Sequence, residues 1–215
     1  LLNSPTLAVS ESRNYTVKMG QTAIEALAKS ISLVEKFDEK VVDEIIEKEK
    51  ELDDYEDKLG TFLVKISGHD LTEADSNTVA TLLHAIGDFE RIGDHAENFH
   101  EIGVEMLNKN ITFTDQARTG INNMRDTVIS MFGISKHAFE NSQKDELSGL
   151  TELEQNVDNM KRELIADHFN RLAEGNCSVE VSPYYSSVVV GLERVADHLV
   201  NVGYSIVNPT GSQKN

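Results

Sequence analysis

The sequence lacks most of the features that mark secreted and membrane-spanning chains. Cys177 is the only cysteine among the 215 residues, so no disulfide can form within the chain. A chain without disulfides fits a reducing compartment. No apolar run approaches the roughly 20 residues that a membrane-spanning helix needs, and no signal-peptide pattern is present. We therefore expect this segment to fold in water.

Tryptophan is absent, there are only three prolines, and aromatic residues make up 6% of the chain. This scarcity favours helices over a β-sandwich. Basic residues are also few: 20 Lys and Arg stand against 37 Asp and Glu, which gives a net charge of -17. Such a chain repels nucleic-acid phosphates and anionic lipid, so we expect no nucleic-acid partner and an attraction for cations.

Six segments show apolar residues at three- and four-residue intervals, the spacing of helices that bury one face. Thr72 and Ser182 are suited to cap the third and sixth helices, and Pro183 suits the first turn of the sixth. Residues 1–14 are expected to form a lead-in and residues 208–215 a polar tail. The helices are predicted at about 15–36, 41–67, 73–107, 115–141, 146–174 and 183–207.

The strongest pattern in the chain is an internal repeat. The stretch Glu90–Asn98 recurs as Glu193–Asn201, and both copies carry Glu, Arg, Asp, His and Asn at the same relative positions. The helices before each copy align as well, at an offset of about 105 residues, and a repeat of this length fixes the architecture. We predict an all-α fold of two tandem antiparallel three-helix bundles, residues 15–108 and 112–207, with one continuous core.

Each copy of the repeat places a Glu and an Asp one helical turn apart, on the same face of its helix. The second and fifth helices carry another pair at that spacing. Like charges so placed repel each other, and core packing does not require them. Where two pairs converge from adjacent helices, four carboxylates form a site for a hard cation. The predicted ligands are Glu49, Asp53, Glu90 and Asp94 in the first half, and Glu154, Asp158, Glu193 and Asp197 in the second.

Iron or manganese suits such a cluster, and zinc or nickel could occupy it. The other polar residues of the repeat allow two interpretations. The arginines either orient metal-bound carboxylates or pair with the Asp of their own helix. The histidines are ligands, hydrogen-bond donors to ligands, or polar contacts within the bundle, and the asparagines are expected to support the carboxylates. These residues are Arg91, His95, Asn98, Arg194, His198 and Asn201.

The repeated stretches, Glu-Arg-(Ile/Val)-(Gly/Ala)-Asp-His, resemble the signature of the PhoU family, and the resemblance extends over residues 12–207. It implies two three-helix bundles, a role in regulating phosphate uptake, and multinuclear metal clusters, commonly of iron, on the two sets of four carboxylates. Ala196 stands where the first copy has Gly93, and Val200 where it has Glu97. The second site is therefore expected to bind fewer ions, or none.

The opening residues Leu2–Ala8 resemble the junction after the last membrane helix of bacterial sodium/phosphate cotransporter-like proteins, and the chain begins with Leu rather than Met. This resemblance implies a PhoU-like C-terminal domain on the cytoplasmic side of the membrane, with the transporter domain of the same chain as its partner. The alternative is a free-standing PhoU-type regulator of a phosphate ABC transporter and its signalling. Inorganic phosphate is a further expected partner through the metal, and a homodimer is left open.

The chain contains no Gly-x-x-x-x-Gly-Lys phosphate loop and no Gly-x-Ser-x-Gly elbow, which are the local signatures of two large enzyme classes. The resemblance to the PhoU family implies a regulator, and we predict no catalytic residues. Two other classes are left open by the residues alone. One is a metal-dependent hydrolase or oxidase that uses the same clusters. The other is a helical adaptor whose acids are surface charge.

Overall fold

The structure is a computed structural model, and it describes residues 4–141 and 144–205. These residues form six α-helices and one short 3-10 helix. Their order is α1 (Pro5–Glu35), α2 (Glu39–Ser67), α3 (Glu73–Lys109), α4 (Asp115–Asn141), α5 (Leu147–Ala173), η1 (Val179–Val181) and α6 (Ser182–Tyr204). Within the described part of the chain, no helix is both long and apolar enough to cross a bilayer.

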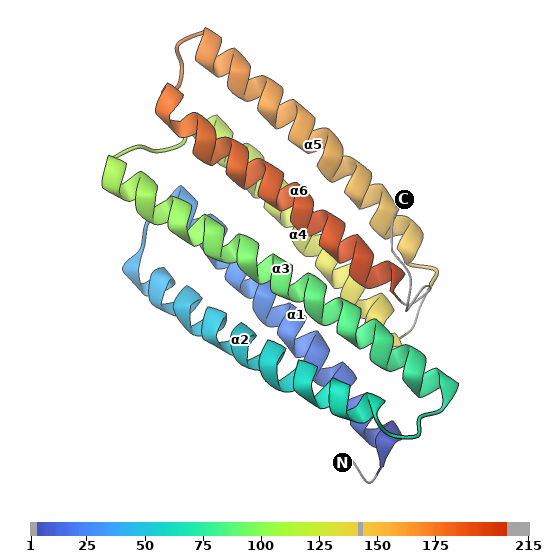
Figure 1. The fold of residues 1–215 in the computed structure, drawn as a ribbon. Helices are drawn as coiled ribbons and strands as arrows, with labels where there is room; N and C mark the ends of the chain where they lie inside the picture. The colour runs from blue at the N-terminus through green and yellow to red at the C-terminus, as the bar shows by residue number, and fades with distance from the viewer. Residues whose placement is uncertain (1–3, 142–143, 206–215) are drawn as a thin grey trace.

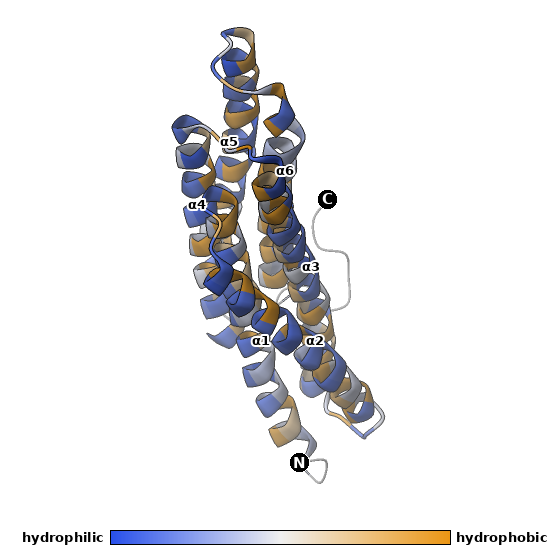
Figure 2. Ribbon diagram, turned by 90° about the vertical axis from the view of Figure 1, so that its left-hand side faces the viewer, coloured by the Kyte–Doolittle hydropathy of each residue, from blue (hydrophilic) through white to orange (hydrophobic). Residues whose placement is uncertain are grey.

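The helices form two antiparallel three-helix bundles side by side (Figure 1). In the first bundle α1 packs against α2 and α3, and in the second α4 packs against α5 and α6. The bundles meet where α3 lies along α6 and where α1 lies along α4. One hydrophobic core runs through both, and Figure 2 shows apolar and polar residues alternating along the helices. The predicted tandem bundles with a continuous core are confirmed.

Helix ends lie close to their predicted positions where polar side chains cap free backbone N–H groups. The Thr72 hydroxyl accepts a hydrogen bond from the backbone N–H of Asp75, 3.1 Å away, at the start of α3. Asp38 caps α2 in the same way, through the N–H of Lys40. α3 ends at Lys109, and Asn110 caps it in the left-handed conformation (φ 54°) that asparagine tolerates well.

The prediction for the start of α1 is wrong, because the helix begins at Pro5 and takes in most of the expected lead-in. Proline suits a first helical turn, where its missing N–H is not needed. Ala8 and Val9 are buried, and the Thr6 hydroxyl donates a hydrogen bond to Asp75 of α3 over 2.8 Å. These tertiary contacts hold the first turns in place. The predicted end of the sixth helix and the tail lie outside the described residues.

A glycine controls the contact between the two bundles. Gly191 of α6 faces Phe99 of α3 so closely that a Cβ atom at position 191 would lie 2.7 Å from the Cε1 atom of the ring. Across the same contact, Nδ1 of His198 lies 3.0 Å from Oδ1 of Asp88. Asp88 and Gly191 occupy equivalent positions of the repeat, so this interface is not symmetric.

We expect Gly191→Ala to lower the free energy of unfolding by about 1–3 kcal/mol, because the added methyl group must displace the Phe99 ring or the helix. Gly87→Ala is the matched control on α3. A Cβ atom there meets nothing within 4 Å, so the control should gain about 0.5–1 kcal/mol from its helix propensity. Urea unfolding of both variants measures the difference, and a Gly191→Ala variant as stable as the control would contradict the close contact.

Candidate metal centre

A cavity of about 180 Å³ lies between α2 and α3, and carboxylates dominate its lining. Met19 and Leu52 supply the apolar part of the lining together with Gly93, where a Cβ atom would lie 3.0 Å from Cδ1 of Leu52. The glycine thus lets α2 and α3 approach each other beside the acids. The acidic residues at the cavity are Glu49, Asp53 and Glu56 of α2 and Glu90, Asp94 and Glu97 of α3.

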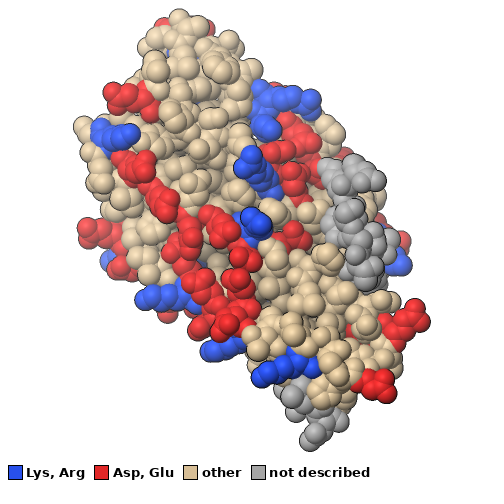
Figure 3. Space-filling model, in the orientation of Figure 1, with Lys and Arg blue, Asp and Glu red and all other residues tan. Residues whose placement is uncertain are grey.

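The helical repeat explains why these acids gather. On each helix the three acids stand at positions i, i+4 and i+7, which share one face. α2 and α3 pack against each other, and both acidic faces open into the same cavity. Figure 3 shows the result as a band of acidic side chains over α2 and α3, with a second group between α5 and α6 on the same side of the molecule.

The crowding of like charges opposes full ionisation of this cluster. Burial, and then the charge of Glu90, raises the pKa of Glu56. Burial, and then the charge of Glu49, raises the pKa of Glu97. His100 reaches the edge of the cluster, where its Nδ1 atom lies 3.4 Å from Oε1 of Glu49. A cation bound among the carboxylates would reverse these shifts, because it favours the charged form of each acid.

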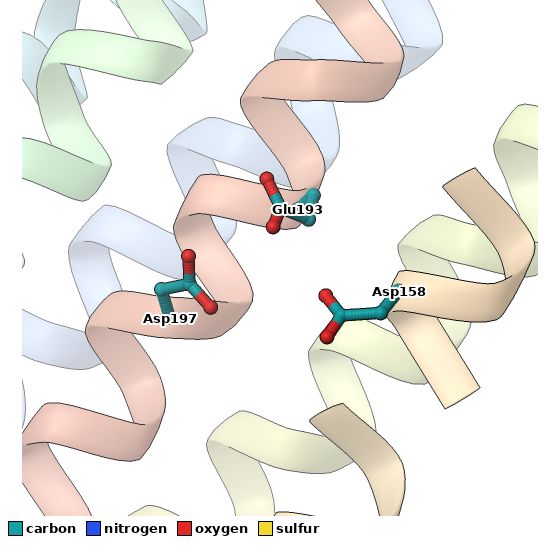
Figure 4. A group of neighbouring side chains, drawn as sticks. All are labelled: Asp158, Glu193 and Asp197. Carbon is teal, nitrogen blue, oxygen red and sulfur yellow. The ribbon is translucent and has the colours of Figure 1, made fainter. Parts of the chain in front are cut away.

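In the second half, α5 and α6 bring Asp158, Glu193 and Asp197 together (Figure 4). One carboxylate oxygen of each residue lies within 4.8 Å of the others. Asp158 points from α5 toward the two acids of α6. Burial, followed by the charges of Glu193 and Asp158, raises the pKa of Asp197 from 3.8 to about 6. Three oxygens at these separations suit a single hard cation.

The two clusters differ at the third acidic position of each helix. Lys161 stands in the second half where Glu56 stands in the first, and its Nζ atom lies 3.5 Å from Oε2 of Glu193. Val200 replaces Glu97 and is buried. The second cluster therefore contains a cationic side chain and an apolar one where the first has carboxylates.

Glu154 is the most deeply buried of the predicted ligands, with 2% of its surface exposed. Its counterpart in the first half, Glu49, is partly exposed and lines the cavity. Glu154 lies one helical turn before Asp158, and it is not one of the three residues whose oxygens approach within 4.8 Å. The structure thus brings three carboxylates of the second set together and places the fourth deeper in the bundle.

Exposure differs among the other polar residues of the repeat. Arg91, Arg194 and Asn98 are exposed, and Asn201 is partly buried. Neither Arg91 nor Asn98 lines the cavity between α2 and α3. Both side chains follow an acid by one residue and are therefore rotated by about 100° from it. Their positions do not provide direct support for the carboxylates.

His95 and His198 lie at the contact between the bundles. Their ring centroids are 6.2 Å apart, and His198 contacts Asp88 of α3. Burial, and then the charge of His198, lowers the pKa of His95. Of the interpretations that the sequence left open, the geometry supports a polar contact within the helix assembly. Each histidine directly follows an Asp, so its side chain is rotated by about 100° from that carboxylate and lies at the contact between the bundles. The two histidines therefore lie close to each other.

Four residues of the clusters are not among the ligands predicted from the sequence, namely Glu56, Glu97, His100 and Lys161. A spacing signal was present for all of them. Glu56 and Lys161 each follow an assigned Asp by three residues, and His100 follows Glu97 by three. Residues three apart share a helix face, so extending the Glu-x-x-x-Asp pattern by one step finds Glu56, Glu97 and Lys161, and a second step finds His100.

Comparison with known proteins gives the same family for both halves. The sequence profile of the PhoU domain matches residues 16–102 and again residues 121–206. A phosphate-specific transport system accessory protein PhoU homolog from Clostridium acetobutylicum is 23% identical over 201 residues, covering 92% of this chain and 90% of that protein. A homolog of the same name from Xylella fastidiosa is 18% identical over 196 residues, covering 89% and 78%.

Solved structures share the fold. PhoU from Pseudomonas aeruginosa superposes with a TM-score of 0.86 at 15% identity, covering 96% of this chain and 98% of that one. The phosphate transport system regulatory protein PhoU from Streptococcus pneumoniae gives a TM-score of 0.80 at 16% identity, covering 99% and 100%. At these identities the likeness establishes the arrangement of the helices.

The raised pKa of Asp197 predicts a pH-dependent stability in the metal-free protein. Between about pH 4 and pH 6 the folded state holds a proton on Asp197 that the unfolded state has released, so the free energy of unfolding falls as pH rises through this window. Asp197→Asn should flatten that fall and raise the melting temperature at pH 7. Thermal unfolding in a chelator, with the exposed Asp43→Asn as control, measures the effect. Equal curves for the two variants would contradict it.

Proposed function

Because the chain belongs to the PhoU family, as the domain match in each bundle shows, we propose that it regulates phosphate transport. The family match carries the proposal, since it spans both bundles and the relatives are named as accessory or regulatory proteins of phosphate transport. The site of action that we propose is the cytoplasmic side of the membrane, against a phosphate transport system.

The comparisons favour the accessory type of regulator over the transporter tail that the opening residues suggested. The relatives from C. acetobutylicum and X. fastidiosa are named as accessory proteins, and this chain covers 90% and 78% of their lengths. The resemblance of Leu2–Ala8 to a membrane junction rests on few residues, and in the structure most of these residues form the first turn of α1. We therefore propose a partner on another chain.

We further propose that the two clusters bind metal ions as part of this role. Six carboxylates supply hard oxygen donors to the first cavity, and their mutual repulsion opposes the metal-free state. Glu49, Asp53, Glu90 and Asp94 would hold ions there, with help from Glu56 and Glu97. Iron or manganese fits this donor set. The cavity of about 180 Å³ offers room for more than one ion.

The second cluster is proposed to bind less metal than the first. Lys161 already contacts Glu193, and a cation must compete with that ion pair.

A metal held by exposed carboxylates turns a strongly negative surface into one that attracts anions. Inorganic phosphate would then bind to the metal rather than to the chain, which links phosphate concentration to the state of the bundles without a catalytic step.

The metal assignment predicts that Glu90→Gln with Asp94→Asn lowers the metal affinity of the first bundle by at least about tenfold, because two of the converging oxygens lose their charge. Glu193→Gln with Asp197→Asn should have a smaller effect on total metal content. Elemental analysis of the purified protein measures both.

A matched control lies on α2 itself. Glu39 and Asp43 form the same Glu-x-x-x-Asp spacing, and both are exposed away from the cavity. Glu39→Gln with Asp43→Asn should leave the metal content unchanged. If the control lost as much metal as the cavity variant, the ions would be bound by the general negative charge, and the assignment would fail.

The regulatory role is tested in a bacterial strain that lacks its own copy of the gene. Loss of the protein should raise the uptake of labelled phosphate when external phosphate is plentiful, and the wild-type chain should restore the low rate. The Glu39/Asp43 variant should restore it too, whereas the Glu90/Asp94 variant should not. Unchanged uptake in the deletion strain, or turnover of a phosphoester by the metal-loaded protein, would contradict a non-catalytic regulator.

A further inference from the structure

A second, larger opening lies on the first bundle, away from the carboxylate cavity. It is a groove of about 600 Å³ between the N-terminal part of α1 and the C-terminal part of α2, and we name it the α1–α2 groove. Three aromatic side chains, those of Tyr15, Tyr55 and Phe62, line it together with Leu59. Tyr15 is 47% exposed. Exposed aromatic surface in a concave site is typical of binding sites.

The internal repeat shows that the fold does not require this groove. In the second bundle, Gly120 occupies the position equivalent to Tyr15, and Leu164 occupies the position equivalent to Leu59. α4 and α5 come so close there that a Cβ atom on Gly120 would lie 2.3 Å from Cδ2 of Leu164. Asp167 takes the place of Phe62. The second bundle thus closes the space between its first two helices, whereas the first bundle keeps this space open and lines it with aromatic rings.

The rim of the groove is acidic. Glu11, Glu51 and Asp54 line it, and the one cation in the lining, Lys58, lies 3.9 Å from Asp54. A cation already contacts the aromatic edge of this site, because Nζ of Lys18 lies 5.1 Å from the centre of the Tyr15 ring. Aromatic faces and carboxylates both attract cationic side chains. The surface is therefore complementary to a partner that is apolar on one side and basic on the other.

We propose that the α1–α2 groove docks a basic amphipathic helix of a partner protein. Its apolar residues would pack on Tyr15, Tyr55 and Phe62, and its Lys or Arg residues would meet the acids of the rim. A second copy of this chain is a poor occupant, because each copy carries a net charge of -17 and would bring acid against acid. The groove is separate from both carboxylate clusters, so docking depends neither on metal nor on the proposed regulation of phosphate transport.

The absence of tryptophan from the chain makes docking measurable. The probe is a designed amphipathic helix of about 18 residues, roughly five turns, with Leu and one Trp on one face and Lys on the other. A second peptide carries Glu in place of Lys. Titration of the wild-type protein in a chelator should shift the Trp emission of the Lys peptide to shorter wavelength, and the Glu peptide should not respond.

Charge reversal on α2 tests the position of the site. Glu51→Lys with Asp54→Lys should weaken binding of the Lys peptide by about tenfold or more, through loss of the rim charges. The matched control, Asp43→Lys with Glu47→Lys, makes the same change in net charge on exposed positions of α2 outside the groove, and it should weaken binding by less than about threefold. Tyr15→Ala should weaken binding by about fivefold or more while circular dichroism stays unchanged.

Three results would overturn the proposal. The first is equal loss of binding in the two charge-reversal variants, which would mean attraction to the overall negative charge. The second is a lack of binding by the Lys peptide at physiological ionic strength. The third is a concentration-dependent dimer in sedimentation that Tyr15→Ala abolishes, which would assign the groove to a second copy of the chain. None of these three measurements involves phosphate transport, so none of them tests the proposed regulatory role.

Discussion

The close packing of α3 against α6 determines how the two halves of this protein act together. Phe99 fills the space that Gly191 leaves open, and Asp88 meets His198 across the same seam. Because these helices occupy the middle of the assembly, the outer helices α2 and α5 flank them, and the acidic faces open on one side of the molecule (Figures 1 and 3). His95 and His198 also lie at this contact between the bundles, away from the cavity.

Duplication of the bundle did not yield two equal sites. The first cluster adds Glu56 and Glu97 to the four predicted carboxylates, while the second has Lys161 and Val200 in those places. Each exchange removes a carboxylate from the second cluster, so fewer oxygen ligands remain there. The same divergence appears far from the acids, where Tyr15 borders an open groove and its counterpart Gly120 lets two helices close on each other. The carboxylate cavity and the α1–α2 groove thus both lie on the first bundle.

These differences suggest how a regulator of this fold separates its tasks. The carboxylate cavity is polar and of a size for ions, whereas the α1–α2 groove is larger and has aromatic residues in its lining. Both are built on α2, which contributes Asp53 to one opening and Asp54 to the other. Consecutive residues on a helix face directions about 100° apart, so the two openings lie on different faces of α2. A single outer helix therefore contributes to both openings and keeps them apart.

The sequence by itself determined the helical class, the repeat, the tandem bundles and the faces on which the acids lie, because the spacing of residues on a helix follows from the 3.6-residue turn. It also located Thr72 as a cap, since capping is a local interaction. Only the tertiary structure decided the rest. The early start of α1 depends on burial of Ala8 and Val9 and on a hydrogen bond to α3. The burial of Glu154, the contact of Lys161 with Glu193 and the open groove depend on how closely neighbouring helices approach, and helix approach is set by side chains distant in sequence, which no local spacing encodes.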